Sequence, residues 1–170
     1  MQNNENIRKW SDLRGLPVVI VSQGRKAGTL EDFYFDPGTN EVYALRLKTG
    51  FFGYKALLSS AIKAIGQDAI TVNTEEMLTE EKHDGRLPVL PLGESLLSYK
   101  VMSEKGNVVG SIGNVLLDIS RPVALHITAF ELSGGLRDRL TGRYPTFSAN
   151  EIVRYGEDVI VIIDQAAKRL

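Results

Sequence analysis

The chain has 170 residues, of which 43% are hydrophobic and 24% are charged, the balance of an ordinary soluble globular protein. Its formal net charge of −1 provides no overall field that would attract nucleic acid or an acidic membrane surface. The sequence contains no cysteine, which excludes disulfides and thiolate metal sites and fits a reducing compartment such as the cytoplasm.

The chain starts with a polar, acidic segment at 1–6 that is unlike a signal or transit peptide, and we expect this segment to be disordered. The longest uninterrupted apolar runs, at 18–21 and 159–163, have the length of strands and are too short to span a bilayer.

Short strands joined by turns are predicted for the first part of the chain. Ser11 or Asp12 can cap a single helical turn that Gly15 ends. A β-branched run at 17–21 predicts the first strand, and Gly24 in the following turn supplies a positive φ.

Two longer strands are predicted at 27–35 and 41–48, joined by an Asp-Pro-Gly turn. Alternation in the second of these places Tyr43, Leu45 and Leu47 on one face, as in a half-buried antiparallel strand.

An aromatic loop framed by glycines at 50–54 precedes a strand at 55–58, and a hairpin leads to a closing strand at 69–72. This first part therefore holds about six short strands at regular spacing, which is typical of a small barrel or sandwich.

A boundary is predicted after the closing strand. Asn73 as a cap, with Glu76 three residues later, predicts a helix at 73–82. The prolines of 83–91 predict an extended, stiff linker. The chain is thereby divided into a first domain at 1–76, the helix end and linker at 77–91, and a second domain at 92–170 that closes with a short helix at 165–170.

The second half repeats the first at turn glycines, turn aspartates and core aliphatics. The identical pairs are Val19/Val101, Gly24/Gly106, Gly28/Gly110 and Asp36/Asp118, then Ile62/Ile152, Gly66/Gly156, Asp68/Asp158 and Ile70/Ile160. A period this long indicates a domain duplication. The second copy has extra residues at 133–144, where the first copy has its aromatic loop.

Nearly all of residues 10–72 resembles a known family on an ordered set of motifs. These are Leu13-Arg14-Gly15, the glycine turn at 23–28, Asp32-Phe33-Tyr34-Phe35-Asp36, the Gly-Phe-Phe-Gly loop at 50–53 and the segment 60–70. The set resembles the PRC-barrel domain family. The second copy is a weaker match, with Leu96-Leu97-Ser98 at the opening and Asn114 where the first copy has Asp32.

The resemblance implies an all-β protein of two tandem six-stranded β-barrels, with short helices at the linker and the C-terminus. PRC-barrels form the cytoplasmic domain of the photosynthetic reaction centre H subunit and the C-terminal domain of the ribosome maturation factor RimM. Many others stand alone in bacteria and archaea. Their roles are adaptor-like, in docking on a membrane complex or a ribosomal protein, so the resemblance implies a style of function rather than a partner.

The repeated glycines have the spacing of a phosphate loop, but such a loop needs a helix immediately after it, and here an alternating strand follows. We therefore interpret the repeated residues as structural turn residues: Gly24, Gly28, Asp36, Gly66, Asp68, Gly106, Gly110, Asp118, Gly156 and Asp158. Asp32 differs because it lies within a strand, where it could bend the barrel or carry protons.

No catalytic residue, metal site or cofactor is predicted. His83 in the linker and His126 in a strand are isolated, with no serine or aspartate constellation around them.

Two loops are the candidates for interaction. Phe51, Phe52 and Tyr54 would mark a binding site if they are exposed, although they could instead plug the open end of the barrel. The inserted loop forms a short amphipathic turn with a basic face, made by Arg137, Arg139 and Arg143 against Asp138, with Leu136, Leu140 and Tyr144 interleaved. That loop could touch an acidic protein, anionic lipid or RNA, or be a solvated insertion.

Three hypotheses about function follow. The preferred one is a cytoplasmic, non-enzymatic adaptor that docks on a protein assembly through these loops, at the periphery of a photosynthetic or other membrane complex. The second is an RNA-processing or ribosome-associated factor similar to RimM, which the near-neutral charge disfavours. The third is an enzyme or a small-ligand binder that uses a cleft between the barrels.

Overall fold

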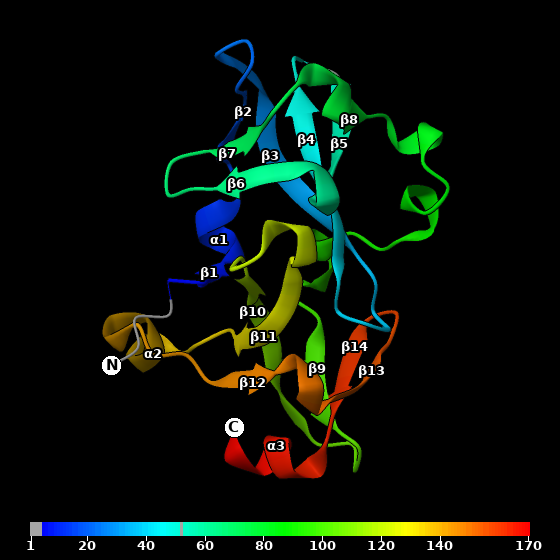
Figure 1. Ribbon diagram of the computed structural model, residues 1–170. Helices are drawn as coiled ribbons and strands as arrows, with labels where there is room; N and C mark the ends of the chain where they lie inside the picture. Colours follow the sequence, from blue (N-terminus) through cyan, green and yellow to red (C-terminus); the bar gives the residue numbers. More distant parts are fainter. Residues whose placement is uncertain (1–4, 52) are drawn as a thin grey trace.

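The computed structural model describes residues 5–51 and 53–170, which form two curled β-sheets, one above the other in Figure 1. The predicted all-β class is confirmed, with 46% of the residues in strands. Most of the predicted disordered segment, residues 1–4, lies outside the described residues. Asn6 is ordered, because its carbonyl accepts a hydrogen bond from the Ile119 N–H at 2.7 Å.

The first sheet is antiparallel except for one parallel pair, in which β7 lies beside β2. Its order is β6-β7-β2-β3-β4-β5-β8. The strands are β2 (Pro17–Ile20), β3 (Arg25–Phe35), β4 (Val42–Thr49), β5 (Gly53–Leu58), β6 (Ile62–Ile65), β7 (Ile70–Val72) and β8 (Leu78–Thr79).

The second sheet has the same order of six strands, β13-β14-β9-β10-β11-β12, again with one parallel pair. Its strands are β9 (Lys100–Ser103), β10 (Val108–Asp118), β11 (His126–Leu132), β12 (Thr146–Ser148), β13 (Ile152–Tyr155) and β14 (Val159–Ile162). A seventh strand, β1 (Ile7–Lys9), comes from the start of the chain and pairs with β10. The α-helices are α1 (Trp10–Leu13), α2 (Leu136–Thr141) and α3 (Asp164–Arg169).

The predicted helix at 73–82 is wrong. The segment forms two 3-10 turns, η2 (Glu75–Met77) and η3 (Glu81–His83), and between them β8 extends along the edge of β5. Its apolar residues, Met77 and Leu78, are adjacent and leave the segment without the apolar stripe of a helix, whereas the edge of β5 offers backbone hydrogen bonds to an extended chain.

The predicted alternation in β4 is wrong at its start. A register shift between β3 and β4 pairs Tyr34 with Ala44 but Phe35 with Val42, so Tyr43 is the extra residue. Val42 therefore joins Leu45 on the core side, and Tyr43 packs on the outer face.

The two sheets share one hydrophobic core, with buried residues from both halves in a single cluster. Tyr155 of β13 lies between Phe35 and Phe130, with ring centroids 5.7 Å and 6.2 Å away. Its hydroxyl donates to the Asn40 side chain at 2.7 Å. Two backbone hydrogen bonds also cross between the halves, Val42 N to Leu125 O and Ile127 N to Asn40 O.

Each half also sends the segment before its own sheet across to the other half. β1 lies along the end of β10, and residues 91–92 lie along the end of β3, where Tyr34 bridges to Leu92 and the Phe35 N–H donates to the Pro91 carbonyl. The exchange is reciprocal and ties each half to the other at two places.

The segment predicted to be a stiff linker packs on the outer face of the first sheet. Leu87 is buried against Tyr34 and two alanines of that face. The Tyr34 hydroxyl donates to Glu81 at 2.7 Å, and the Tyr43 hydroxyl donates to Asp84 at 2.9 Å. The segment is therefore held on the first sheet by both apolar packing and hydrogen bonds.

Candidate functional site

The aromatic loop between β4 and β5 is an exposed tip. The side chain of Phe51 is 92% exposed, so it does not plug the end of the sheet. Tyr54 is 47% exposed and its ring lies under the guanidinium of Arg46, whose Cζ is 4.1 Å from the ring centroid. Phe52, also predicted as a contact, lies outside the described residues. The loop thus presents one exposed aromatic side chain, Phe51, and a second, half-exposed ring, Tyr54, on which Arg46 is stacked.

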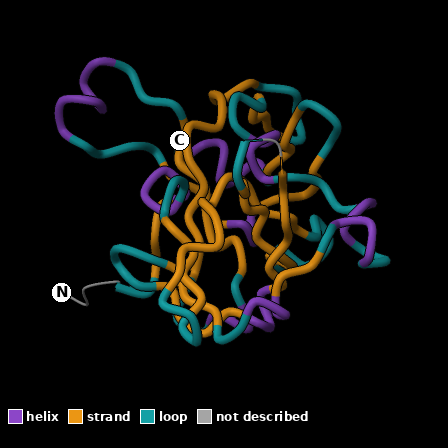
Figure 2. Tube along the Cα trace, turned by 90° about the horizontal axis from the view of Figure 1, so that it is seen from above, coloured by secondary structure: helices purple, strands orange, loops and turns teal. Residues whose placement is uncertain are grey.

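The inserted loop carries α2, which stands away from the strands in Figure 2. Its two leucines, Leu136 and Leu140, are 74% and 79% exposed. Gly142 ends the helix in the left-handed conformation, and its N–H donates to the Asp138 carbonyl at 2.8 Å. At the other end, the Asp138 carboxylate accepts from the Gly135 N–H at 2.9 Å. The helix is short, but both of its ends are hydrogen-bonded.

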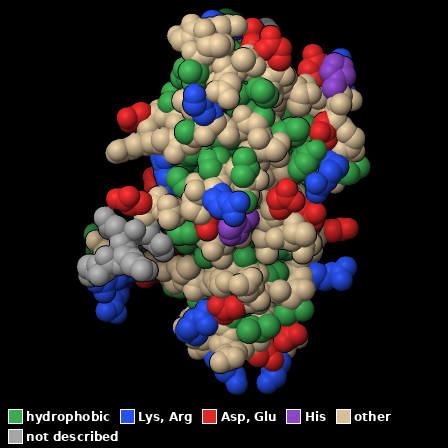
Figure 3. Space-filling view, in the orientation of Figure 1, with side chains coloured by type: hydrophobic (Ala, Val, Ile, Leu, Met, Phe, Trp, Pro, Cys, Tyr) green, Lys and Arg blue, Asp and Glu red, His purple; other side chains and the backbone are tan. Residues whose placement is uncertain are grey.

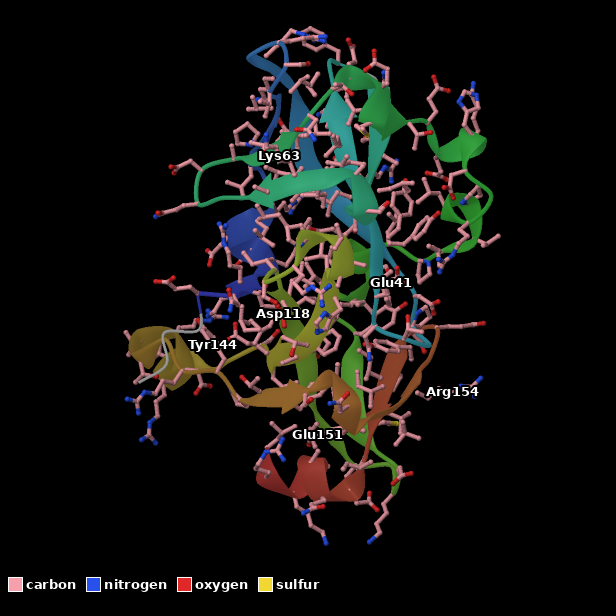
Figure 4. The ribbon with its side chains drawn as sticks, viewed as in Figure 1. Glu41, Lys63, Asp118, Tyr144, Glu151 and Arg154 are labelled. Carbon is pink, nitrogen blue, oxygen red and sulfur yellow. The ribbon has the colours of Figure 1, made fainter. Side chains whose placement is uncertain are left out.

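Tyr144 lies at the base of this loop rather than at its tip, on the side that faces the second sheet (Figure 4). The Lys9 ammonium is 5.5 Å from the centroid of the Tyr144 ring. Gly134 packs so closely on the same ring that a Cβ at position 134 would be 2.7 Å from Cδ1 of Tyr144. Tyr144 therefore supports the loop. The predicted contact residues Arg137, Arg139 and Arg143 are exposed.

A polar cleft of about 500 Å³ opens between this loop, the second sheet and the segment that follows β1. Lys9 forms an ion pair with the largely buried Glu131 at 3.1 Å, and the Asn114 amide donates to the Ser11 hydroxyl at 2.8 Å. Asp12 and Arg139 complete its charged lining. No sequence signal predicted this site, because its residues come from distant parts of the chain.

The structure does not bring the two predicted loops together. Figure 1 places the end of β4 at the top of the molecule and α2 at its side, and Figure 2 shows the same separation from above. The two predicted loops are therefore two separate surfaces of the molecule.

Comparison with known families gives one result. Residues 5–78 match the PRC-barrel domain family. The matched part runs from β1 to the first residue of β8 and so holds all of the first sheet but Thr79, including the loop with Phe51. The resemblance noted for the first copy is thereby confirmed for that copy, and the match does not extend to the second half. No curated protein matches the chain.

The structure shows what the repeated glycines do in both halves of the chain. Gly24 and its counterpart Gly106 have φ values of 60° and 87° in the turns that follow β2 and β9. Gly28 and Gly110 were predicted as turn residues, but they lie inside β3 and β10, next to register shifts. At Gly28 the reason is close approach, because a Cβ there would be 2.6 Å from the Lys48 carbonyl oxygen.

The remaining repeated residues lie at strand ends. Asp36, which follows β3, accepts from the Gly38 N–H at 2.8 Å. Asp118, the last residue of β10, accepts from the hydroxyl and the N–H of Ser120, and these bonds lower the pKa of its carboxyl. The others lie in the β6–β7 and β13–β14 turns: Gly66, Asp68, Gly156 and Asp158.

Asp32 forms a hydrogen bond between the two halves of the molecule. Its Oδ1 accepts from its neighbour Phe33 N at 2.8 Å and from Glu94 N, in the second half, at 2.9 Å. Asn114 does the same in reverse: its Oδ1 accepts from Val115 N and from Ser11 N in the first half. Burial is the largest influence on the Asp32 carboxyl and raises its pKa, against the lowering by these two N–H groups.

In the part of the chain that the structure describes, no three His, Cys, Asp or Glu side chains come together in a group that could hold a metal ion. His126 lies 3.7 Å from Asp118 and is half exposed. Acidic and basic side chains are interspersed over the face shown in Figure 3. Among residues 5–51 and 53–170, every helix is too short or too polar to cross a bilayer.

Proposed function

We propose that this protein is a non-enzymatic adaptor that docks on a larger protein complex, for example a photosynthetic or other membrane-associated assembly. The observation that carries the proposal is the loop between β4 and β5, where Phe51 is 92% exposed and Tyr54, three residues later, is 47% exposed with Arg46 stacked on its ring. Exposed aromatic side chains with an arginine are enriched in the centres of protein interfaces. The match to a family with adaptor-like roles supports the same function.

We also propose that residues 92–170 are a second, diverged PRC-barrel-like domain. The strand order of the second sheet repeats that of the first, each with one parallel pair, and Asn114 makes the same kind of hydrogen bonds as Asp32. The two domains would then form one rigid body that carries two separate contact surfaces.

The test is affinity purification of the tagged full chain from its native cells, followed by mass spectrometry of the soluble and membrane fractions. Phe51→Ser is expected to lose the main protein partner, because a buried interface aromatic contributes about 2 kcal/mol or more. Val89→Ser is the matched control, since Val89 is also highly exposed but lies in the linker. A partner that Phe51→Ser retains at full yield would contradict the proposal.

A second candidate is favoured by the polar cleft beside α2. We propose that it binds a small polar ligand, because an acid, Asp12, and a base, Arg139, both line it. A thermal-shift screen of polar metabolites tests this candidate. A true ligand would raise the melting temperature of the wild type but not of Asp12→Asn or Arg139→Gln.

A further inference from the structure

The loop that carries α2 combines an apolar side with unpaired positive charge. Leu136 and Leu140 are four residues apart, so their side chains lie on the same side of the helix, and both are about three-quarters exposed. Exposing two leucines at the tip of a projecting loop is unfavourable in water, which indicates that something covers them.

The charges around these leucines are almost all positive. Arg137 and Arg143 flank them, and neither guanidinium forms an ion pair within the described residues. The single acid, Asp138, is turned inward as the cap of the Gly135 N–H. Arg139 faces the polar cleft and is therefore not part of the outer face.

From these features we infer that the α2 loop binds an anionic lipid surface, with Leu136 and Leu140 inserted at the headgroup level and Arg137 and Arg143 at the lipid phosphates. This contact is distinct from the proposed protein docking at Phe51 and does not depend on it. A peripheral contact of this kind would hold the protein at a membrane while the PRC-barrel tip remains available to a protein partner.

The size of the loop favours a bilayer over a protein as the occupant. A six-residue helix is only about 9 Å long. A stable protein interface buries roughly 800 Å² of surface on each partner, which is more than so short a helix can provide. A bilayer requires no such matched area, because apolar insertion and attraction to anionic headgroups act on a single projecting segment. Figure 2 shows that α2 is the element that stands farthest from the strands, so it can reach a flat surface without hindrance from the sheets.

The experiment is co-sedimentation of the full chain with vesicles of phosphatidylcholine, with or without about one third phosphatidylserine. Binding is expected for the anionic vesicles only and is expected to weaken as salt is raised. Each arginine near an anionic surface strengthens binding about fivefold, so Arg137→Gln/Arg143→Gln is expected to weaken it on the order of twentyfold. Leu136→Ser/Leu140→Ser is expected to abolish sedimentation.

Two control variants remove the same types of side chain, an exposed apolar one and an exposed arginine, at positions outside the α2 loop. Val89→Ser removes an exposed apolar side chain of the linker, and Arg154→Gln removes an exposed arginine of β13, which Figure 4 shows on the other side of the molecule from α2. Both should bind anionic vesicles as the wild type does. The emission of Trp10, the sole tryptophan and a buried one, reports whether each variant is folded.

Equal sedimentation with neutral and anionic vesicles, or unchanged binding by both α2 variants, would overturn the inference. Loss of vesicle binding in Phe51→Ser would also overturn it, because the lipid contact would then lie at the PRC-barrel tip. If the α2 variants instead lose a protein partner and the wild type binds no vesicles, the loop binds protein. That result would overturn the lipid contact while leaving the adaptor function in place.

Discussion

At the scale of single residues, the molecule uses an acid and an amide for the same task. Asp32 and Asn114 each accept one N–H from the next residue and one from the opposite half of the chain. The Asn114 amide is uncharged, so it accepts these two hydrogen bonds without burying a charge. The Asp32 carboxylate, when ionised, is a buried charge beside the negative charge of Glu94, and both effects raise its pKa above the ordinary value of 3.8.

The raised pKa leads to a prediction about pH. The folded state holds a proton on Asp32 more tightly than the unfolded state does, so the contribution of this group to stability falls as pH rises from 3.8 through the folded pKa and is constant above it. Asp32→Asn keeps the acceptor oxygen and removes the buried charge. It is therefore expected to be at least as stable as the wild type at pH 7, and urea melts at several pH values should show that the local pH dependence is gone.

Asp32→Ala is the contrasting variant. It leaves the Phe33 and Glu94 N–H groups without their acceptor, which is expected to destabilise the protein by about 1–3 kcal/mol at every pH. If Asp32→Asn were as unstable as Asp32→Ala, the carboxylate charge itself, through its attraction to Arg46, would be the stabilising feature.

At the scale of elements, the strands and turns of the first half were predictable because each is determined by local pattern. The alternation at 45–48, the Asp-Pro-Gly turn and the turn at Gly24 depend only on neighbouring residues. The inward position of Val42 was not predictable, because it depends on a register shift against β3. The helix at 73–82 was mispredicted for a similar reason, since the nearby edge of β5 decided the conformation.

The exchange of the segments that precede each sheet, β1 and residues 91–92, could not be predicted from local sequence pattern either. The pairing of β1 with β10 depends on how the two halves face each other, and the cleft at Lys9 and Glu131 results from that pairing. The two candidate contact loops could be found from the sequence because they are exposed, local features. Their separation in space could not, because it is set by the arrangement of the sheets.

Removal of β1 tests the exchange. A chain that starts at Trp10 loses the strand beside residues 116–118 of β10, and the ion pair that neutralises Glu131. Hydrogen exchange measured by mass spectrometry is expected to rise at the end of β10, while β2 and β7 keep their protection. Unchanged exchange in β10 would mean that β1 contributes little to the second sheet.

At the scale of the whole molecule, the shared core predicts that the two halves unfold together. Phe35 and Phe130 come from different sheets and meet through Tyr155, and each half is also held by a segment of the other. Exposing the core of one half would remove buried contacts from the other, so neither half has an independent boundary along which to separate. Calorimetry is expected to show one transition, with equal calorimetric and van't Hoff enthalpies.

Phe130→Ala makes this prediction sharper, because the side chain is fully buried in the second sheet. Its loss is expected to cost about 3–5 kcal/mol, and to lower the single melting temperature by roughly 10 °C. Trp10 packs against Phe33 of the first sheet. If the halves unfold together, the change in Trp10 fluorescence on melting should nevertheless move to the same lower temperature as the rest of the transition. Two separated transitions, with only one of them shifted, would show that the halves are independent domains and that the crossing segments do not couple them.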